Sequence, residues 1–145
     1  MTSVFHPYLN FGENCREAFT RYHEILGGEL EVMTMADVPG DDIPADRAHL
    51  VMHAALSLPG GGLLMASDTG DPDFGPVQGI YVSLSVPDPA EAERVFTALA
   101  DGGEIEMPLE TTFWSPMFGV CRDRFGTPWM VGADPVDDPA PGSAA

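Results

Sequence analysis

The sequence predicts an α+β fold made of two βαβββ units that form one curved mixed sheet with the helices on its outside. Two helical patterns with the same start, apolar spacing and end occur once in each half of the chain. A strand pattern precedes each helix, and further strand patterns joined by glycine-containing turns follow it. Internal similarity of this kind indicates a repeated architecture.

The first expected element of each half is a strand. Apolar residues alternate with polar or mixed residues over 5–11 and again over 80–86. A period of two places the apolar side chains on one face and the hydrogen-bonding side chains on the other. We expect the apolar face to pack against the helix and the opposite face to be the working surface.

The next expected element is a helix that begins at a capping residue. Asn14 and Asp88 are the expected N-caps, and a glutamate follows each of them three residues later, as in a capping box. Both helices are expected to end at a glycine pair, at 27–28 and at 102–103.

Each helix is followed by the pattern of three strands. The residues directly after the glycine pairs are similar in the two halves of the chain. The later strands are expected at 50–58, 63–67, 117–122 and 127–132. We expect one domain over residues 1–134, with repeat 1 at about 4–68, a linker at about 69–78, repeat 2 at about 79–133 and a flexible tail at 135–145.

The composition limits the partners. Twenty-three acidic residues against six arginines give a formal net charge of −17, which would repel nucleic acids and anionic membranes. The acidic residues are scattered, which favours a role in solubility over a cationic partner. The chain has no apolar run of membrane-spanning length, and its first residues lack the pattern of a signal peptide, so a cytoplasmic location is expected.

Several short stretches follow one another along the chain at 8–11, 14–15, 51–54, 64–68, 112–114, 118–119 and 123–129. These stretches resemble the vicinal oxygen chelate superfamily, which includes glyoxalase I, extradiol dioxygenases and bleomycin-binding proteins. Within it the chain is similar to the PhnB-like group, which is also labelled 3-demethylubiquinone 3-methyltransferase. This resemblance implies a homodimer with a ligand site in the cleft between the repeats. A methyltransferase is not expected, because no glycine-rich turn leads from a strand into a helix.

Metal-dependent members of the superfamily hold one divalent ion with His and Glu side chains on the first and last strands of each half. The resemblance maps these positions onto His6, Met65, Tyr81 and Met130. One imidazole, one phenol and two thioethers are poor ligands for a hard or borderline divalent ion. We therefore expect no glyoxalase-type metal centre and no cofactor, with a divalent metal bound partly by His6 as the alternative.

Other residues have more than one interpretation. His53 shares the more polar face of its strand and is either a general base or ligand-binding group, or a strand histidine bonded to a neighbour. Trp114 is expected to line the pocket and Trp129 to be core. Arg122 is expected to form a salt bridge. The residues expected to line the ligand-binding cleft are His6, Tyr8, His53, Met65, Tyr81, Trp114, Phe118 and Met130.

Three functions are compatible with these observations. The first is binding of a small molecule in a mostly apolar cleft without a metal. The second is a divalent-metal-dependent lyase, isomerase or dioxygenase. The third is a non-catalytic dimeric interaction module. The sequence does not identify the ligand, because the fold alone supplies a pocket but no chemistry.

Overall fold

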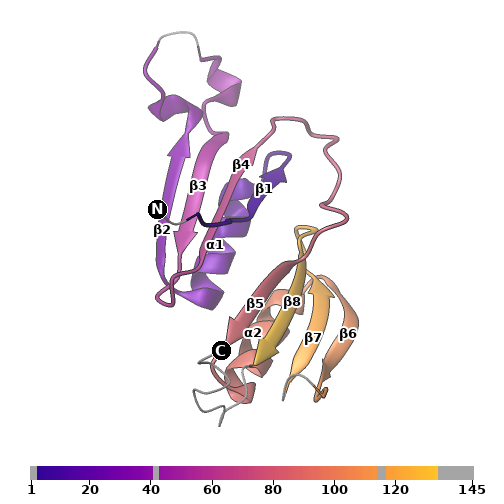
Figure 1. The fold of residues 1–145 in the computed structure, drawn as a ribbon. Coiled ribbons are helices and arrows are strands. Elements are labelled where there is room, and N and C mark those ends of the chain that lie inside the picture. Colours follow the sequence, from indigo (N-terminus) through magenta and orange to yellow (C-terminus); the bar gives the residue numbers. More distant parts are fainter. Residues whose placement is uncertain (1–2, 41–42, 114–116, 134–145) are drawn as a thin grey trace. The chain divides into compact units, whose positions relative to one another are not determined.

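The computed structural model describes residues 3–40, 43–113 and 117–133, and the chain divides into two compact units, Met1–Val77 and Gln78–Ala145 (Figure 1). In the described residues, each unit contains one α-helix and one four-stranded sheet. No helix among these residues is long and apolar enough to cross a membrane.

The first unit has the strand order β1-β4-β3-β2, in which β1 and β4 are parallel and the other pairs antiparallel. Two short 3-10 turns lie in the connection between β2 and β3. The elements are β1 (Tyr8–Phe11), α1 (Cys15–Leu26), β2 (Glu29–Thr34), the turns Met35–Asp37 and Ala45–Arg47, β3 (Val51–Ser57) and β4 (Leu63–Asp68).

The second unit repeats this topology with the strand order β5-β8-β7-β6, and again only the first pair is parallel. Both leading strands are shorter than the alternation predicted, because hydrogen-bonded pairing starts at Tyr8 and at Val82. The elements are β5 (Val82–Val86), α2 (Pro89–Ala100), β6 (Glu104–Glu110), β7 (Phe118–Arg122) and β8 (Pro128–Ala133).

The predicted α+β class and the two βαβββ units are confirmed. Within each unit the strand ladders form one four-stranded mixed sheet. The alternation of side chains indicates which face of a strand is apolar. It does not indicate which strand edges form hydrogen bonds with each other.

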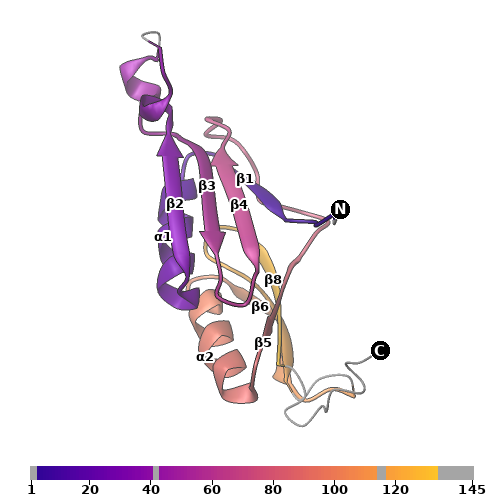
Figure 2. The same cartoon turned by 60° about the vertical axis from the view of Figure 1, so that its left-hand side comes forward.

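Each helix covers one face of its own sheet (Figures 1 and 2). Under α1, the neighbouring strands contribute Leu9, Ala54 and Ala66 in one register row, and all three are buried. Under α2, Trp129 and Val131 are buried in the same way. The opposite face of each sheet carries no helix of its own unit, so its side chains are the ones available for contacts.

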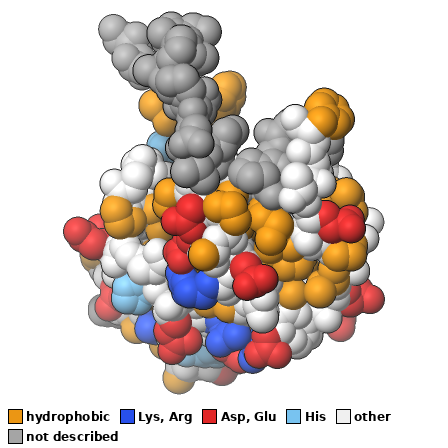
Figure 3. All heavy atoms as spheres, turned by 90° about the horizontal axis from the view of Figure 1, so that it is seen from below, with side chains coloured by type: hydrophobic (Ala, Val, Ile, Leu, Met, Phe, Trp, Pro, Cys, Tyr) orange, Lys and Arg blue, Asp and Glu red, His pale blue; other side chains and the backbone are white. Residues whose placement is uncertain are grey.

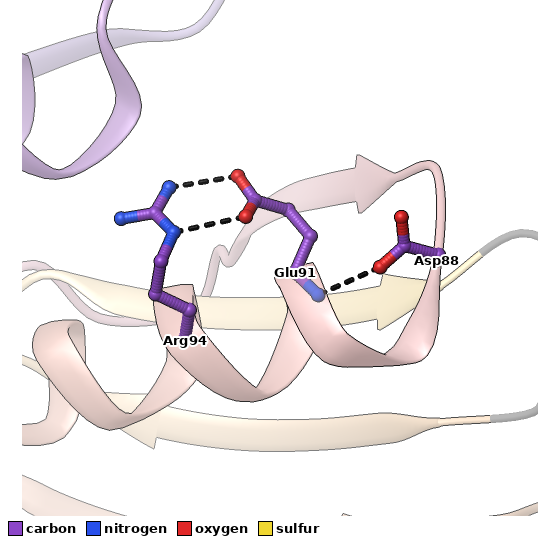
Figure 4. Close-up of polar contacts among 3 residues, drawn as sticks. All are labelled: Asp88, Glu91 and Arg94. Carbon is purple, nitrogen blue, oxygen red and sulfur yellow. Dashed lines mark hydrogen bonds and ion pairs between the residues drawn. The ribbon is translucent and has the colours of Figure 1, made fainter.

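The start of α2 is the predicted cap. The Glu91 backbone N–H donates to the Asp88 carboxylate at 2.8 Å, and Pro89 occupies the first turn. The Glu91 side chain does not return to the cap residue as a capping box requires. It instead receives two hydrogen bonds from Arg94 one turn later (Figure 4).

The start of α1 differs from the prediction. The Asn14 side chain makes no capping bond; the Cys15 N–H donates instead to the Asp68 carboxylate at 2.9 Å. The other oxygen of Asp68 accepts the Val51 N–H at 2.8 Å. A residue distant in sequence therefore caps the helix and ties it to β3, which no local pattern could have indicated.

The second unit contains one buried turn carboxylate. Asp123 accepts hydrogen bonds from the N–H groups of Phe125 and Thr127 and from the indole nitrogen of Trp129, each at 2.9 Å. Asp123 therefore closes this turn and also anchors the core tryptophan. The acidic side chains elsewhere are scattered over the face drawn in Figure 3 and do not form one patch.

Candidate functional site

The helix-free face of the first sheet is built from alternate residues of all four strands. Met65 in β4 lies opposite Tyr8 in β1 on one side and opposite Ala55 in β3 on the other. His53, two residues before Ala55, faces the same side and pairs with Met33 in β2. Since side chains two residues apart share a face, these five residues form one continuous surface.

Tyr8 and His53 are joined across this surface. The Tyr8 hydroxyl lies 3.2 Å from Nδ1 of His53, and the two ring centroids are 5.8 Å apart with a tilt of 36°. Because β4 separates β1 from β3, the phenol extends over β4 to reach the imidazole. Tyr8 remains 46% exposed, so the pair offers a hydrogen-bonding group to a ligand.

The proton in this hydrogen bond can belong to either partner. If the phenol donates, Nδ1 accepts and the neutral ring carries its proton on Nε2. If Nδ1–H donates to the phenol oxygen, Nε2 keeps a free lone pair. His53 can therefore act toward a ligand as a donor or as an acceptor. Its interpretation as a histidine bonded to a neighbour and its interpretation as a ligand-binding group are both compatible with this geometry.

The helix-free face of the second sheet repeats the arrangement with different side chains. Met130 in β8 lies opposite Ser83 in β5 and Val120 in β7, as Met65 lies opposite Tyr8 and Ala55. The register therefore makes Met65 and Met130 structural equivalents. Phe118, two residues before Val120, is the equivalent of His53, so the two faces differ in their polar groups.

A polar group lies on the same side of the second sheet. The Tyr81 hydroxyl donates to Glu106 at 2.8 Å, and Arg122 Nε lies 3.8 Å from the other oxygen of that carboxylate. The hydrogen bond to Glu106 raises the pKa of the Tyr81 phenol above its ordinary value. Arg122 also donates to the carbonyl of Gly126 at 2.6 Å. The expected salt bridge of Arg122 is confirmed, while Glu106 was not singled out from the sequence.

Comparison with known proteins places the chain in a family. A family profile described as 3-demethylubiquinone-9 3-methyltransferase matches residues 3–132. The chain belongs to this PhnB-like family. Protein YjdN of Escherichia coli K12 is 32% identical over 135 residues, which cover 86% of this chain and 91% of the relative.

Solved structures agree with this assignment. Protein PA1353 from Pseudomonas aeruginosa matches this PhnB-like chain with a TM-score of 0.81 and 47% identity, covering 92% of this chain and 98% of the other. The PhnB protein from Bacillus cereus matches with a TM-score of 0.71 and 23% identity, covering 90% and 99%, which shows the fold alone. The fold is that of the glyoxalase, bleomycin resistance and dioxygenase superfamily.

The donor set of this PhnB-like protein does not fit the divalent ion of the metal-dependent superfamily members. Among the described residues, no three His, Cys, Asp or Glu side chains form a group suited to a metal. The metal-ligand position on the last strand of each unit holds a methionine, Met65 in β4 and Met130 in β8. A thioether is a weak ligand for Zn²⁺, Mn²⁺ or Mg²⁺. The absence of a glyoxalase-type centre stays a prediction, supported by the chemistry of these side chains.

The remaining predicted site residues are placed as follows. His6 is exposed in the segment before β1, and Tyr81 lies just before β5. Trp114 lies outside the described residues. The predicted cleft between the repeats stays a prediction.

The two cysteines are not candidate nucleophiles. Cys15 and Cys121 are both completely buried, and burial raises the pKa of each thiol to about 12. A thiol with such a pKa remains protonated near neutral pH and does not supply the reactive thiolate. Their role is therefore packing, Cys15 in the first turn of α1 and Cys121 in β7.

Proposed function

We propose that this PhnB-like protein binds a small organic molecule on the helix-free faces of its sheets, without a glyoxalase-type divalent metal. The observation that carries the proposal is the exposed Tyr8–His53 pair, held at 3.2 Å on a face that also carries Met33 and Met65. Sites for small organic ligands combine apolar lining with a few convergent polar groups. This face has both.

The lining residues suit a ligand of moderate size. Met65 and Met33 can adapt their side chains to an irregular apolar ligand, because methionine has three rotatable bonds and a polarisable sulfur. In the second unit, Met130 and Phe118 supply comparable apolar surface beside the Tyr81–Glu106 hydrogen bond. The net charge of −17 favours a neutral or cationic ligand over an anionic one.

Methyl transfer, which the family description names, is not part of the proposal. The turns that lead from strand to helix are 12–14 after β1 and 87–88 after β5, and neither is rich in glycine. A nucleotide-type cofactor would need such a turn at a helix start.

We further propose that the protein acts as a homodimer in the cytoplasm. Sedimentation equilibrium of the full chain tests the dimer.

A thermal-shift screen of neutral and cationic aromatic compounds, followed by calorimetry on the hits, tests the binding proposal. Tyr8→Phe and His53→Asn are expected to weaken a hit by roughly 2- to 10-fold, the effect of losing one hydrogen bond. His49→Asn is the matched control, because His49 is exposed outside the sheet. Equal weakening by all three variants, or no hit, would contradict the proposal.

Elemental analysis of protein purified without a metal-affinity tag tests the second half of the proposal. Stoichiometric zinc, iron, nickel or manganese that is lost in His6→Ala would refute it and would favour the divalent-metal enzyme. Absence of these metals together with a ligand lost in the Tyr8 and His53 variants would support binding without a metal.

A further inference from the structure

We propose that Met33, Met65 and His53 form a binding site for a soft monovalent metal ion of the copper(I) or silver(I) class. This inference goes beyond the proposed binding of an organic ligand and does not depend on it. It rests on the way that strand register gathers two thioethers around one imidazole on the helix-free face of the first sheet.

The register brings the three side chains within reach of one ion. Met33 and His53 are direct partners across β2 and β3, so their Cβ atoms are about 4.5–5.5 Å apart. Met65 is opposite Ala55, which places it diagonally from His53 at about 7–8 Å. A methionine side chain has enough length and freedom to direct its sulfur to an ion held at the imidazole.

The contact with Tyr8 prepares the imidazole for this role. Its hydroxyl lies at Nδ1, which leaves Nε2 as the ring atom available to an ion. Metal-binding histidines usually donate their other ring N–H to an oxygen, which fixes the tautomer and the ring orientation. With Nδ1–H donating to the Tyr8 oxygen, Nε2 keeps its lone pair for the ion.

The donor atoms select the class of ion. Thioethers are soft ligands that favour copper(I), whereas Mg²⁺, Mn²⁺ and Zn²⁺ prefer oxygen, nitrogen or thiolate. Two thioethers and one neutral imidazole carry no charge, which suits a monovalent ion better than a divalent one. Glu31, opposite Ala55 on the same face, adds negative potential for a cation. Met33 is 45% exposed, so an ion can reach it from solvent.

The second unit provides an internal control. Met130 is the equivalent of Met65, but the equivalent of His53 is Phe118, which has no donor atom. The same sheet architecture therefore lacks the imidazole there. The proposal predicts one ion per chain, bound in the first unit.

Silver(I) titration of the full chain, with the methionine methyl groups labelled for NMR, tests the site in chloride-free buffer. The methyl signals of Met33 and Met65 are expected to shift and to saturate at one ion per chain, while that of Met130 in the second unit stays unchanged. Competition of copper(I) with a chromogenic chelator under anaerobic conditions gives the affinity, and zinc(II) is titrated for comparison.

Variants separate this site from other silver-binding groups. Met33→Leu and His53→Asn are expected to weaken copper(I) binding by at least about tenfold, and Tyr8→Phe by about tenfold through the lost support of the ring. Met130→Leu is the matched control, since Met130 is the equivalent of Met65 in the second unit, where Phe118 stands at the position of His53. Unchanged affinity in Met33→Leu, or tighter binding of zinc(II), would overturn the proposal.

The NMR readout also detects binding by the thiols. Saturation at one ion per chain without a shift of the Met33 and Met65 methyl signals would assign the silver to Cys15 or Cys121 and would refute the site. Because no organic ligand is present, failure here leaves the proposed ligand binding untouched. Failure of the compound screen likewise leaves this titration unaffected.

Discussion

Replacing Asp123 with alanine removes one carboxylate that accepts three hydrogen bonds in the turn before β8. One oxygen accepts the N–H groups of Phe125 and Thr127, and the other accepts the indole N–H of Trp129. Thr127 and Trp129 are almost completely buried, so their donors cannot turn to water when the carboxylate is lost. The Phe125 N–H is only part-buried and can be rehydrated.

The magnitude follows from these two stranded donors. A buried donor left without a partner costs about 1–3 kcal/mol, so the expected loss for Asp123→Ala is about 3–5 kcal/mol. Asp123→Asn keeps one carbonyl oxygen for the two backbone donors but turns an NH₂ group toward the indole N–H, so about 2 kcal/mol is expected. The order of stability should be aspartate, then asparagine, then alanine. A loss of this size is a large part of a typical folding free energy of about 5–15 kcal/mol.

Urea unfolding followed by circular dichroism measures the difference, provided that the slope against urea stays constant. Asp73→Ala is the control, because Asp73 is exposed in the connection between β4 and β5. Its effect on the free energy of unfolding should stay within about 0.5 kcal/mol. A loss for Asp123→Ala no larger than that of the control would refute the reasoning. Asparagine as stable as aspartate would show that the indole bond contributes nothing.

Asp88→Ala is expected to cost about 1 kcal/mol by removing the cap of α2, whereas Asn14→Ala should cost only a few tenths because it makes no capping bond. Equal losses in urea unfolding would contradict this difference. Gly119→Ala should destabilise the protein by about 1–3 kcal/mol, since the added Cβ would lie 2.8 Å from a ring carbon of Phe96 in α2. A variant as stable as the parent would show that the Phe96 ring can move. Cys15 and Cys121 should resist a thiol reagent at about pH 8 and react only after unfolding, because burial raises the pKa of both thiols to about 12. Rapid labelling of the native protein would contradict this expectation.

Much of the fold could be predicted because the periodicity of side chains is local information. Alternation placed Trp129 in the core and Met130 on the opposite face, and the structure shows Trp129 buried and Met130 only partly so. The same alternation put His53 on the more polar face of its strand. A helix start could be predicted from Asp88, because the capping residue is adjacent to the helix that it caps.

The predictions failed where the partner of a residue is distant in sequence. Asn14 has the right residue type for a cap, but Asp68 supplies the oxygen from the end of β4. The role of Glu106 was missed because its strand pairs irregularly with β7, so its position relative to Tyr81 does not follow from spacing. In both cases the deciding information is the pairing of strands and not the sequence around the residue.

The sequence by itself determined the two repeats, the apolar face of each strand and the family to which the chain belongs. These properties depend on patterns within a few residues and on short motifs. Only the tertiary structure decided that β4 lies between β1 and β3, so that Tyr8 reaches His53 over Met65. That contact depends on a parallel pairing between strands far apart in the chain, and the free energy of such pairings comes from the whole sheet and not from either strand alone.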